Sequence, residues 1–233
     1  MQYGSIGLTT MTDARRLYQQ IADQVRQLIV NGQYPPGSRL PAERDLAQQL
    51  GVSRPSLREA LIALEIDGTI EIRMGSGIYV LNAARPAVTG RSLGESPTEL
   101  MQARAVIESA VIVQATAAMP TETLATLRDI LVAMRSEIDE GRKPLEQDRQ
   151  FHLIIAESAG NSVLSEIVAS LFDERHSPMS DHMRGRFETP ETWQFALSEH
   201  EAILAALEAK NPLAAQAAMH AHLTASGRRW VEN

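Results

Sequence analysis

The stretch AERDLAQQLGVSRPSLREAL, residues 42–61, has the pattern of two short amphipathic helices separated by a tight turn. Gly51 can end the first helix, and Ser53 can cap the second, whose first turn tolerates Pro55. Apolar side chains recur at helical spacing along one face of each segment. These positions are Leu46, Leu50 and Val52 in the first helix and turn, and Leu57, Ala60, Leu61 and Leu64 in the second. The stretch therefore predicts a helix-turn-helix.

The segments on both sides extend this motif. A helix is predicted from Arg15 to Asn31, before the break at Pro35-Pro36. On the other side, TIEIRMGSGIYVL predicts two short strands, Ile70–Arg73 and Ile78–Leu81, joined by the turn Met74–Gly77. Together these elements make a winged helix-turn-helix, with the hairpin as the wing.

The rest of the chain has a different pattern. Residues 84–96 carry several Pro and Gly and predict a linker, and every later segment favours helix. The expected helical spans are 97–118, 121–140, 144–158, 161–175, 190–209 and 213–230. The expected fold class is mainly α: a winged helix-turn-helix with a small β-hairpin wing over 14–83, and an all-α bundle of about six or seven helices over 97–233. Residues 1–13 are polar, and we expect them to be loosely ordered.

Composition limits the classes of function. The 233 residues carry a net charge of −7, but residues 1–83 hold eight Arg and eight acids, so the second part carries the whole negative balance. All six His also lie in the second part. Because there is no Cys, any metal must be held by His, Asp or Glu. We see no signal-peptide pattern and no run of about 18 apolar residues, and we expect a cytoplasmic protein with no membrane partner.

Polar side chains of the helix-turn-helix are candidates for DNA contact. Those on the outer face of the second helix would meet bases and phosphates if that helix entered the major groove. Arg44, in the first helix, is placed to contact a backbone phosphate, and Gly75 at the wing leaves room for the backbone to approach DNA. The full candidate set is Arg44, Ser53, Arg54, Ser56, Arg58 and Gly75. The alternative is a winged helix used only for protein contacts, with these arginines on a solvated face.

From Leu17 to Leu81 the sequence resembles the DNA-binding domain of the GntR family of bacterial transcription regulators. The phrases PGSRLPAERDLA, GVSRPSLREAL and GSGIYV carry the resemblance. It implies that the candidate residues contact double-stranded operator DNA. A homodimer would double these contacts and match a palindromic operator.

In the second part, Asp148 and His152 lie four residues apart and share one face of a predicted helix. Three interpretations compete: a buried structural pair, half of a metal site, or part of a catalytic centre. His200 and His222, on the last two predicted helices, can supply two more ligands for zinc, nickel or a similar divalent ion. His220 points to a different face from His222, so only one of them can face the bundle interior.

Residues from about 97 to 227 resemble the helical effector domain (FCD type) of the FadR subgroup of the same family. The resemblance includes HEAILAALEAKNPLAAQAAMHAHL, in which His200 and His222 lie 22 positions apart. Metal-binding members carry Asp-x3-His in the fourth helix and two further His in the last two helices. The resemblance therefore implies a metal, Zn²⁺ in the first place and Ni²⁺ or another ion otherwise. The implied ligands are Asp148, His152, His200 and His222.

Arg104, on the inward face of the span 97–118, is a candidate to hold the carboxylate of a small organic acid, because Arg offers a bidentate fork. The alternative is a salt bridge to Glu108, four residues later. Arg175 and His176 are further candidates for effector binding.

The expected function is a homodimeric, ligand-responsive transcription regulator, a repressor rather than an activator. A divalent metal and a small carboxylate in the C-terminal domain would alter operator binding. RRLYQQ, ELMQARAVIES and RQFH look closest to members that respond to hexuronates and related sugar acids, while lactate-type and amino-acid-type effectors stay open. The alternatives are a regulator with a purely structural metal site, and a metal-dependent enzyme fused to a DNA-binding domain. We expect no catalytic residues: Leu204 stands where the second His of a zinc-protease H-E-x-x-H would be.

Overall fold

The computed structural model describes residues 16–81 and 93–231. The chain divides into two compact units, Met1–Arg85 and Pro86–Asn233. The predicted loose segment 1–13 and most of the predicted linker 84–96 lie outside the described residues. The boundaries expected at 14, 84 and 97 therefore stay predictions.

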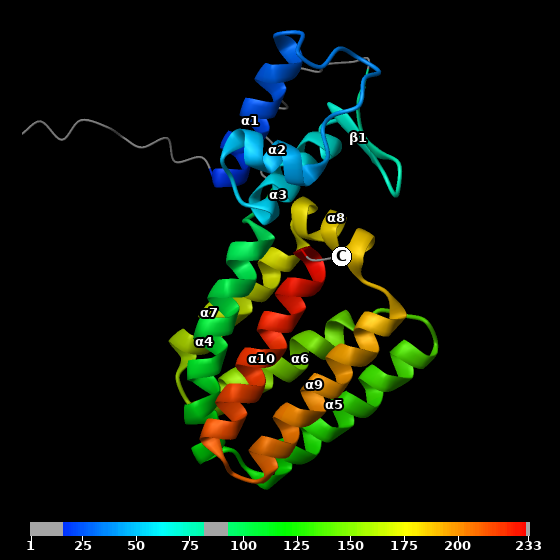
Figure 1. Ribbon diagram of the computed structural model, residues 1–233. Helices are drawn as coiled ribbons and strands as arrows, with labels where there is room; N and C mark the ends of the chain where they lie inside the picture. The colour runs from blue at the N-terminus through cyan, green and yellow to red at the C-terminus, as the bar shows by residue number, and fades with distance from the viewer. Residues whose placement is uncertain (1–15, 82–92, 232–233) are drawn as a thin grey trace, which may run out of the picture. The chain divides into compact units, whose positions relative to one another are not determined.

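The described part of the first unit has three helices followed by a two-stranded hairpin (Figure 1). Its elements are α1 (Leu17–Val30), α2 (Glu43–Leu50), α3 (Arg54–Ile66), β1 (Ile70–Arg73) and β2 (Gly77–Val80). α2 ends at Gly51, whose φ of 68° is left-handed. α3 begins after Ser53, whose Oγ accepts a hydrogen bond from the backbone N–H of Ser56 at 3.2 Å. The predicted helix-turn-helix with a wing is confirmed.

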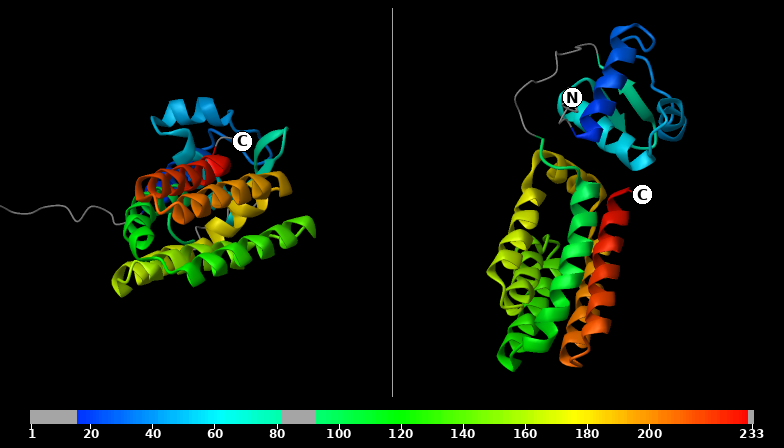
Figure 2. Two further views of the ribbon diagram at one scale, coloured as in Figure 1. Left: turned by 90° about the horizontal axis from the view of Figure 1, so that it is seen from below. Right: turned by 90° about the vertical axis from the view of Figure 1, so that its left-hand side faces the viewer.

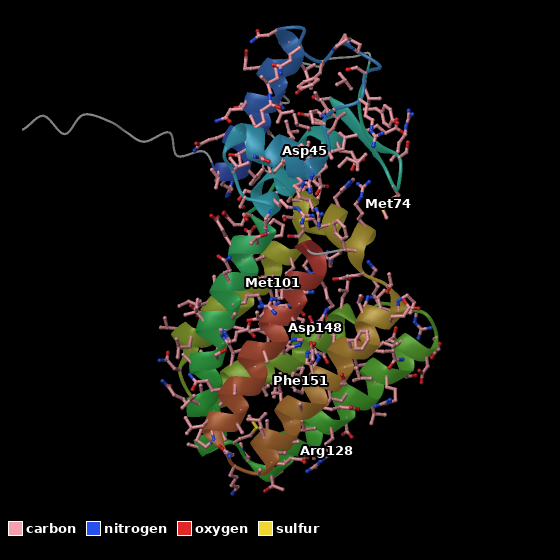
Figure 3. The ribbon with its side chains drawn as sticks, viewed as in Figure 1. Asp45, Met74, Met101, Arg128, Asp148 and Phe151 are labelled. Atoms are coloured by element: carbon pink, nitrogen blue, oxygen red, sulfur yellow. The ribbon has the colours of Figure 1, made fainter. Side chains whose placement is uncertain are left out.

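The hairpin that forms the wing is antiparallel and pairs Ile70 with Val80. Ile70, Ile78 and Val80 are buried against the helices, as expected for a sheet with one covered face. β2 begins and ends one residue earlier than expected, because Gly77 already pairs with Arg73. Met74 lies at the turn between the strands (Figure 3) and is 77% exposed.

The described part of the second unit is a bundle of seven α-helices with one 3₁₀ turn. Its elements are α4 (Pro97–Ala118), α5 (Thr121–Asp139), α6 (Leu145–Ser158), α7 (Ser162–Asp173), η1 (Glu174–His176), α8 (Pro178–Phe187), α9 (Pro190–Glu208) and α10 (Pro212–Val231). α4 and α10 run side by side in Figure 1 and in the right-hand view of Figure 2, and α10 also packs on α9. α6 packs against α4, α5 and α7, so its inward face lies in the bundle interior.

One helix was not foreseen. The sequence pattern predicts no helix or strand between residues 175 and 190. The structure has α8 there, which is capped by Ser177 and begins at Pro178. Only Met179 and Met183 supply apolar side chains to its buried face, which also includes polar residues, so the usual hydrophobic period is weak. None of the helices in the described ranges combines the length and hydropathy needed to cross a bilayer.

Candidate functional site

The start of α3 presents polar side chains to solvent. Arg54 and Ser53 are exposed, and the Oγ atoms of Ser53 and Ser56 lie 2.8 Å apart. On α2, the side chain of Arg44 is 82% exposed and pairs with Asp45 at 3.2 Å. Exposed ion pairs of this kind contribute little to stability, so Arg44 can exchange Asp45 for a phosphate at low cost. This surface is compatible with the predicted DNA contacts.

Arg58 is not on the solvent-exposed face of α3, where the sequence pattern predicted it. We expected it on the solvent face, but its side chain is 10% exposed, and its Nη2 and Nε donate to Glu43 Oε2 at 2.8 and 3.2 Å. The reason is tertiary: α2 packs against α3 and brings Glu43 over this position. A DNA contact by Arg58 stays a prediction, and it requires this pair to open. Gly75 is at the wing turn, with a left-handed φ of 68°.

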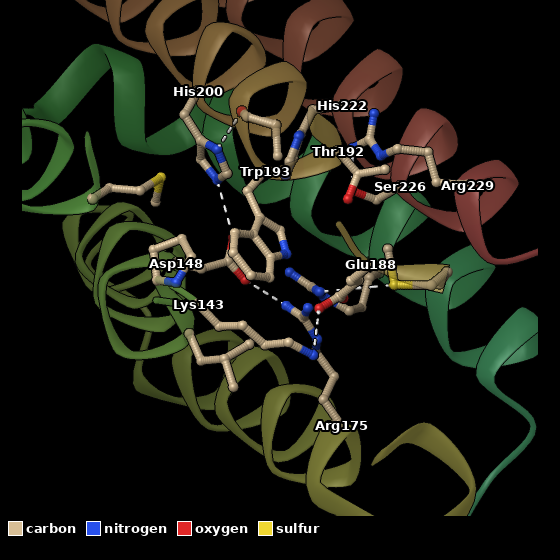
Figure 4. A pocket seen from close by; sticks show the side chains of 16 residues that line it. Lys143, Asp148, Arg175, Glu188, Thr192, Trp193, His200, His222, Ser226 and Arg229 are labelled. Atoms are coloured by element: carbon tan, nitrogen blue, oxygen red, sulfur yellow. Dashed lines mark hydrogen bonds and ion pairs between the residues drawn. The ribbon is translucent and has the colours of Figure 1, made fainter. Parts of the chain in front are cut away.

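Four candidate metal ligands meet inside the second unit, and Figure 4 shows Asp148, His200 and His222 among them. α6 supplies Asp148 and His152 one turn apart, α9 supplies His200, and α10 supplies His222. One donor atom from each lies within 4.8 Å of the other three. The three imidazoles are buried, while Asp148 is partly exposed and places Oδ1 3.1 Å from His200 Nε2. The structure thus brings together all four predicted ligands from three helices.

Each imidazole of this cluster is oriented by a hydrogen bond at Nδ1. The pairs are His152 with Glu108 Oε2 at 2.5 Å, His200 with the carbonyl of Ala196 at 2.7 Å, and His222 with Glu199 Oε2 at 2.8 Å. Carbonyl and carboxylate oxygens only accept hydrogen bonds, so each Nδ1 carries a proton. The other nitrogen, Nε2, is then the donor atom available to a metal. Carboxylate and carbonyl partners behind histidine are the usual outer layer of a zinc site.

Burial favours the neutral imidazoles that a metal needs. Burial lowers the pKa of His152, and burial together with the neighbouring His200 lowers the pKa of His222 to about 3. A neutral imidazole protonated at Nδ1 has a lone pair on Nε2. The Nε2 atoms of His152 and His200 lie 3.2 Å apart, and His200 Nε2 also lies 3.1 Å from Oδ1 of the Asp148 carboxylate. These atoms are close enough to one another to serve as ligands of one divalent cation.

The carboxylate groups around the cluster are ionised. Burial is the largest single influence and would raise the pKa of Asp148, but the Arg175 guanidinium and the neighbouring His200 and His152 together hold this pKa well below its usual range. Burial also opposes ionisation of Glu108, yet Arg104 and the hydrogen bond from His152 hold its pKa at about 2. The cluster therefore offers three imidazole nitrogens and one anionic oxygen, a donor set that fits zinc, nickel or a similar ion.

A pocket adjoins the cluster and encloses about 640 Å³, open solvent at its mouth included. His200, His222 and Asp148 line it, so a ligand in the pocket reaches the donor atoms (Figure 4). The charged side chains in its described lining are Arg104, Lys143, Arg175, Arg229, Asp148 and Glu188. Cations outnumber carboxylates, and a bound metal would add to that excess. The pocket is suited to an anion.

The predicted effector residues differ in position. Arg104 is 1% exposed and lines the pocket, and its Nε also donates to Glu108 at 2.6 Å, so the salt bridge considered as an alternative is present. Arg175 lines the same pocket and pairs with Asp148. His176 lines a smaller neighbouring cavity instead. The structure brings Arg104 and Arg175 to the pocket beside the candidate metal ligands, and it does not bring His176 there.

Several residues of this site were not predicted from the sequence. Trp193 lines the pocket from α9, seven residues before His200, and this spacing on one helix face could have revealed it. Glu199 accepts from His222 and from both terminal nitrogens of Arg229. No local pattern links Glu199 to positions 23 and 30 residues away, so only the packing of α9 on α10 shows it.

Comparison with known proteins gives the family. The FCD domain matches residues 99–225, and the pattern of bacterial regulatory proteins of the gntR family matches residues 17–80. The chain belongs to the GntR family. It is a transcription regulator with a DNA-binding winged helix and an FCD effector domain, a domain type that binds metals and small molecules.

Relatives that match this chain over most of the length of both proteins support this assignment. The Uxu operon transcriptional regulator of Escherichia coli K12 is 35% identical over 97% of this chain and 91% of its own length. The Exu regulon transcriptional regulator of the same strain is 37% identical over 91% of this chain and 84% of its own. The solved structure of E. coli McbR/YncC shares the fold at 21% identity, with a TM-score of 0.52 over 91% of this chain and 95% of that one.

Proposed function

We propose that this GntR-family member is a repressor whose operator binding depends on a divalent metal and a small acid. The metal, Zn²⁺ in the first place, would be held by Asp148, His152, His200 and His222. The observation that carries the proposal is the convergence of three Nδ1-anchored imidazoles and an ionised carboxylate on one point of a cation-lined pocket. On an octahedral ion, these four ligands would leave coordination positions open for an incoming carboxylate.

The effector we propose is a sugar acid of the hexuronate type. Its carboxylate would lie at the metal and Arg104, and Arg175 would hold Asp148 in place. The two relatives named for the Uxu operon and the Exu regulon support this class, as does the resemblance to hexuronate-responsive members. The chain would act in the cytoplasm as a homodimer, because a palindromic operator needs two winged helices. The proposed operator contacts are Arg44, Ser53, Arg54, Ser56, Arg58 and Gly75.

A thermal-shift screen tests the metal and the acid together. The protein is measured before and after chelation against hexuronates, aldonates, aldarates, lactate and amino acids. Zinc at a hundred times its dissociation constant is expected to stabilise the fold by about 2.7 kcal/mol, and a hexuronate should raise the Tm further only when zinc is present. The same acid should then weaken binding to a duplex selected from a random-sequence library by zinc-loaded protein. If zinc stabilises the fold but no acid changes Tm or DNA affinity, the metal is structural and the acid response is wrong.

Two histidines of α10 give a matched control. His222→Ala removes a proposed ligand, whereas His220→Ala removes an exposed imidazole two residues away. Zinc titration by calorimetry should show a loss of about a hundredfold or more in affinity for the first variant, and an unchanged affinity for the second. Equal zinc affinities in the two variants would contradict the assignment of the site.

A further inference from the structure

Two buried hydrogen-bond donors in the wall of the pocket have no partner. They are Nη2 of Arg104 and Nε1 of Trp193. The other nitrogens of Arg104 donate to Glu108 and approach the sulfur of Met101. A buried donor without a partner destabilises the state that contains it, unless something that enters the site accepts its hydrogen. Both donors therefore indicate a missing acceptor in this pocket.

Trp193 lies on α9, on the N-terminal side of His200, the candidate metal ligand of this helix. It precedes His200 by seven residues, or two helical turns, which puts both on the same face of α9 about 10 Å apart along the axis. Ala196, between them, also lines the pocket, and its short side chain leaves space there. Figure 4 shows the indole ring reaching in among Asp148, Lys143 and Glu188.

The neighbouring polar groups at this end already have partners within the protein. Thr192 donates to the carbonyl of Thr189 and accepts from its backbone N–H, in the cap of α9. Lys143 pairs with Glu188 at 3.6 Å, and its ammonium lies 6.0 Å from the centre of the indole ring. The indole N–H thus remains as a neutral, directional donor. A neutral donor suits a hydroxyl or carbonyl oxygen, whereas a carboxylate is better matched by the arginines.

We propose that Trp193 determines the specificity of this pocket by donating its Nε1–H to a hydroxyl or carbonyl oxygen of the acid whose carboxylate lies beside Arg104. This inference rests on the proposed function and narrows it. The ligand is a hydroxylated acid that extends from the metal cluster toward the N-terminal end of α9. A plain alkanoate fills the same space but leaves the indole N–H unpaired, and a site built around a hydrogen bond rejects such an analogue.

A cycle of two proteins and two kinds of acid, uronate and alkanoate, isolates this hydrogen bond. Trp193→Phe keeps an aromatic ring and removes the donor. Zinc-loaded wild type and variant are titrated by calorimetry with D-glucuronate, D-galacturonate and hexanoate. For the better uronate, the variant's Kd is expected to rise by about tenfold to a hundredfold, while its Kd for hexanoate changes less than about twofold. Phe195→Leu changes an exposed aromatic residue of the same helix and should leave every Kd as in the wild type.

Fluorescence gives a second reading with position 193 intact. The chain has two tryptophans, so Trp230→Phe leaves Trp193 as the single emitter. Because a hydrogen bond stabilises the excited indole, saturating uronate should shift the emission of zinc-loaded protein to longer wavelength, and hexanoate should not.

The outcomes separate this inference from the function on which it rests. If zinc-loaded wild type binds no acid at all, the proposed function fails and the role of Trp193 fails with it. If the wild type binds a uronate but Trp193→Phe binds it equally well, or loses both kinds of acid equally, only the role of Trp193 is overturned. Uronate saturation without an emission shift in the Trp230→Phe protein would overturn it as well.

Discussion

The two units of this regulator hold their functional charges in opposite environments. In the DNA-binding unit, Arg44 is 82% exposed and pairs with its sequence neighbour. In the effector unit, Arg104 is 1% exposed and pairs with Glu108, which in turn holds His152. The first charge is available to a partner at once. The Arg104 charge belongs to a hydrogen-bonded network with Glu108 and His152, and this network must be intact for the candidate metal ligands to be correctly placed.

This difference predicts how each unit responds to substitution. An exposed charge contributes about 0–1 kcal/mol to stability, so changing it affects binding and leaves the fold. A buried charge that loses its partner costs several kcal/mol, so changing it affects the fold first. Function and stability are separable in the DNA-binding unit, and they are coupled around the Asp/His cluster of Asp148, His152, His200 and His222.

The largest effect is expected for Glu108→Ala. This change leaves the Arg104 guanidinium buried without its counter-charge and frees the His152 ring from its Nδ1 partner. We expect the metal-free protein to lose about 3–5 kcal/mol of unfolding free energy, measured by urea denaturation. The matched control is Glu208→Ala, which breaks the exposed pair with Arg128 and should cost less than about 1 kcal/mol. Similar losses in the two variants would show that burial does not distinguish these pairs.

The next-largest effect is expected at Glu199, whose carboxylate accepts a hydrogen bond from Nδ1 of His222. Glu199→Gln removes the charge that orients this imidazole and weakens the fork to Arg229. Zinc affinity should fall by about 10- to 100-fold in a competition assay with a chromogenic chelator. Glu201→Gln, two residues further along α9, changes only an exposed partner of Arg135 and should keep wild-type zinc affinity. A wild-type affinity in the Glu199 variant would mean that the metal lies elsewhere.

Acidification should destabilise the metal-free protein through its buried histidines. Burial lowers the pKa of His222 to about 3, while an unfolded histidine titrates near pH 6.5. Between these values the unfolded chain binds more protons, so stability is complete above about pH 6.5 and falls as the pH drops toward 3. The slope is about 1.4 kcal/mol per pH unit for each imidazole that stays neutral, and His152 adds to it.

The measurement is a series of urea melts of chelated protein from pH 7.5 to about pH 5. Replacing His222 by Gln should flatten the slope, and replacing the exposed His220 by Gln should leave it unchanged. A steep slope in the His222 variant would assign the pH dependence to other groups.

How much the sequence could predict also differs between the units. The winged helix depends on short-range signals, such as Gly51 as a helix end and Ser53 as a cap, and all its elements were predicted to within a few residues. The error at Arg58 arose because its partner, Glu43, lies 15 positions away on another helix. Side-chain direction along a single helix does not reveal such a pair.

In the effector unit, Asp148 and His152 are visible as a pair because one helix carries both. Residue type made His200 and His222 candidates for the other two ligands, and the resemblance implied the same set, because their approach depends on how α6, α9 and α10 pack. Glu199, behind His222, was missed for the same reason, whereas the spacing of Trp193 from His200 on α9 could have revealed Trp193. The sequence therefore identifies the candidate metal ligands more readily than the residues that orient them.

The smallest effect on stability is expected for Arg54→Ala at the exposed start of α3. The side chain of Arg54 is exposed to solvent, so the substitution should change the unfolding free energy of the protein by less than about 0.5 kcal/mol. Affinity for the selected operator should nevertheless fall by about 1–3 kcal/mol, measured by fluorescence anisotropy at fixed salt. Arg58→Ala provides the contrast, because it also opens the partly buried pair with Glu43 and should lower stability more than Arg54→Ala does. If Arg54→Ala destabilised the fold as strongly as Glu108→Ala, function and stability would be coupled in both units, and burial would not be the property that separates them.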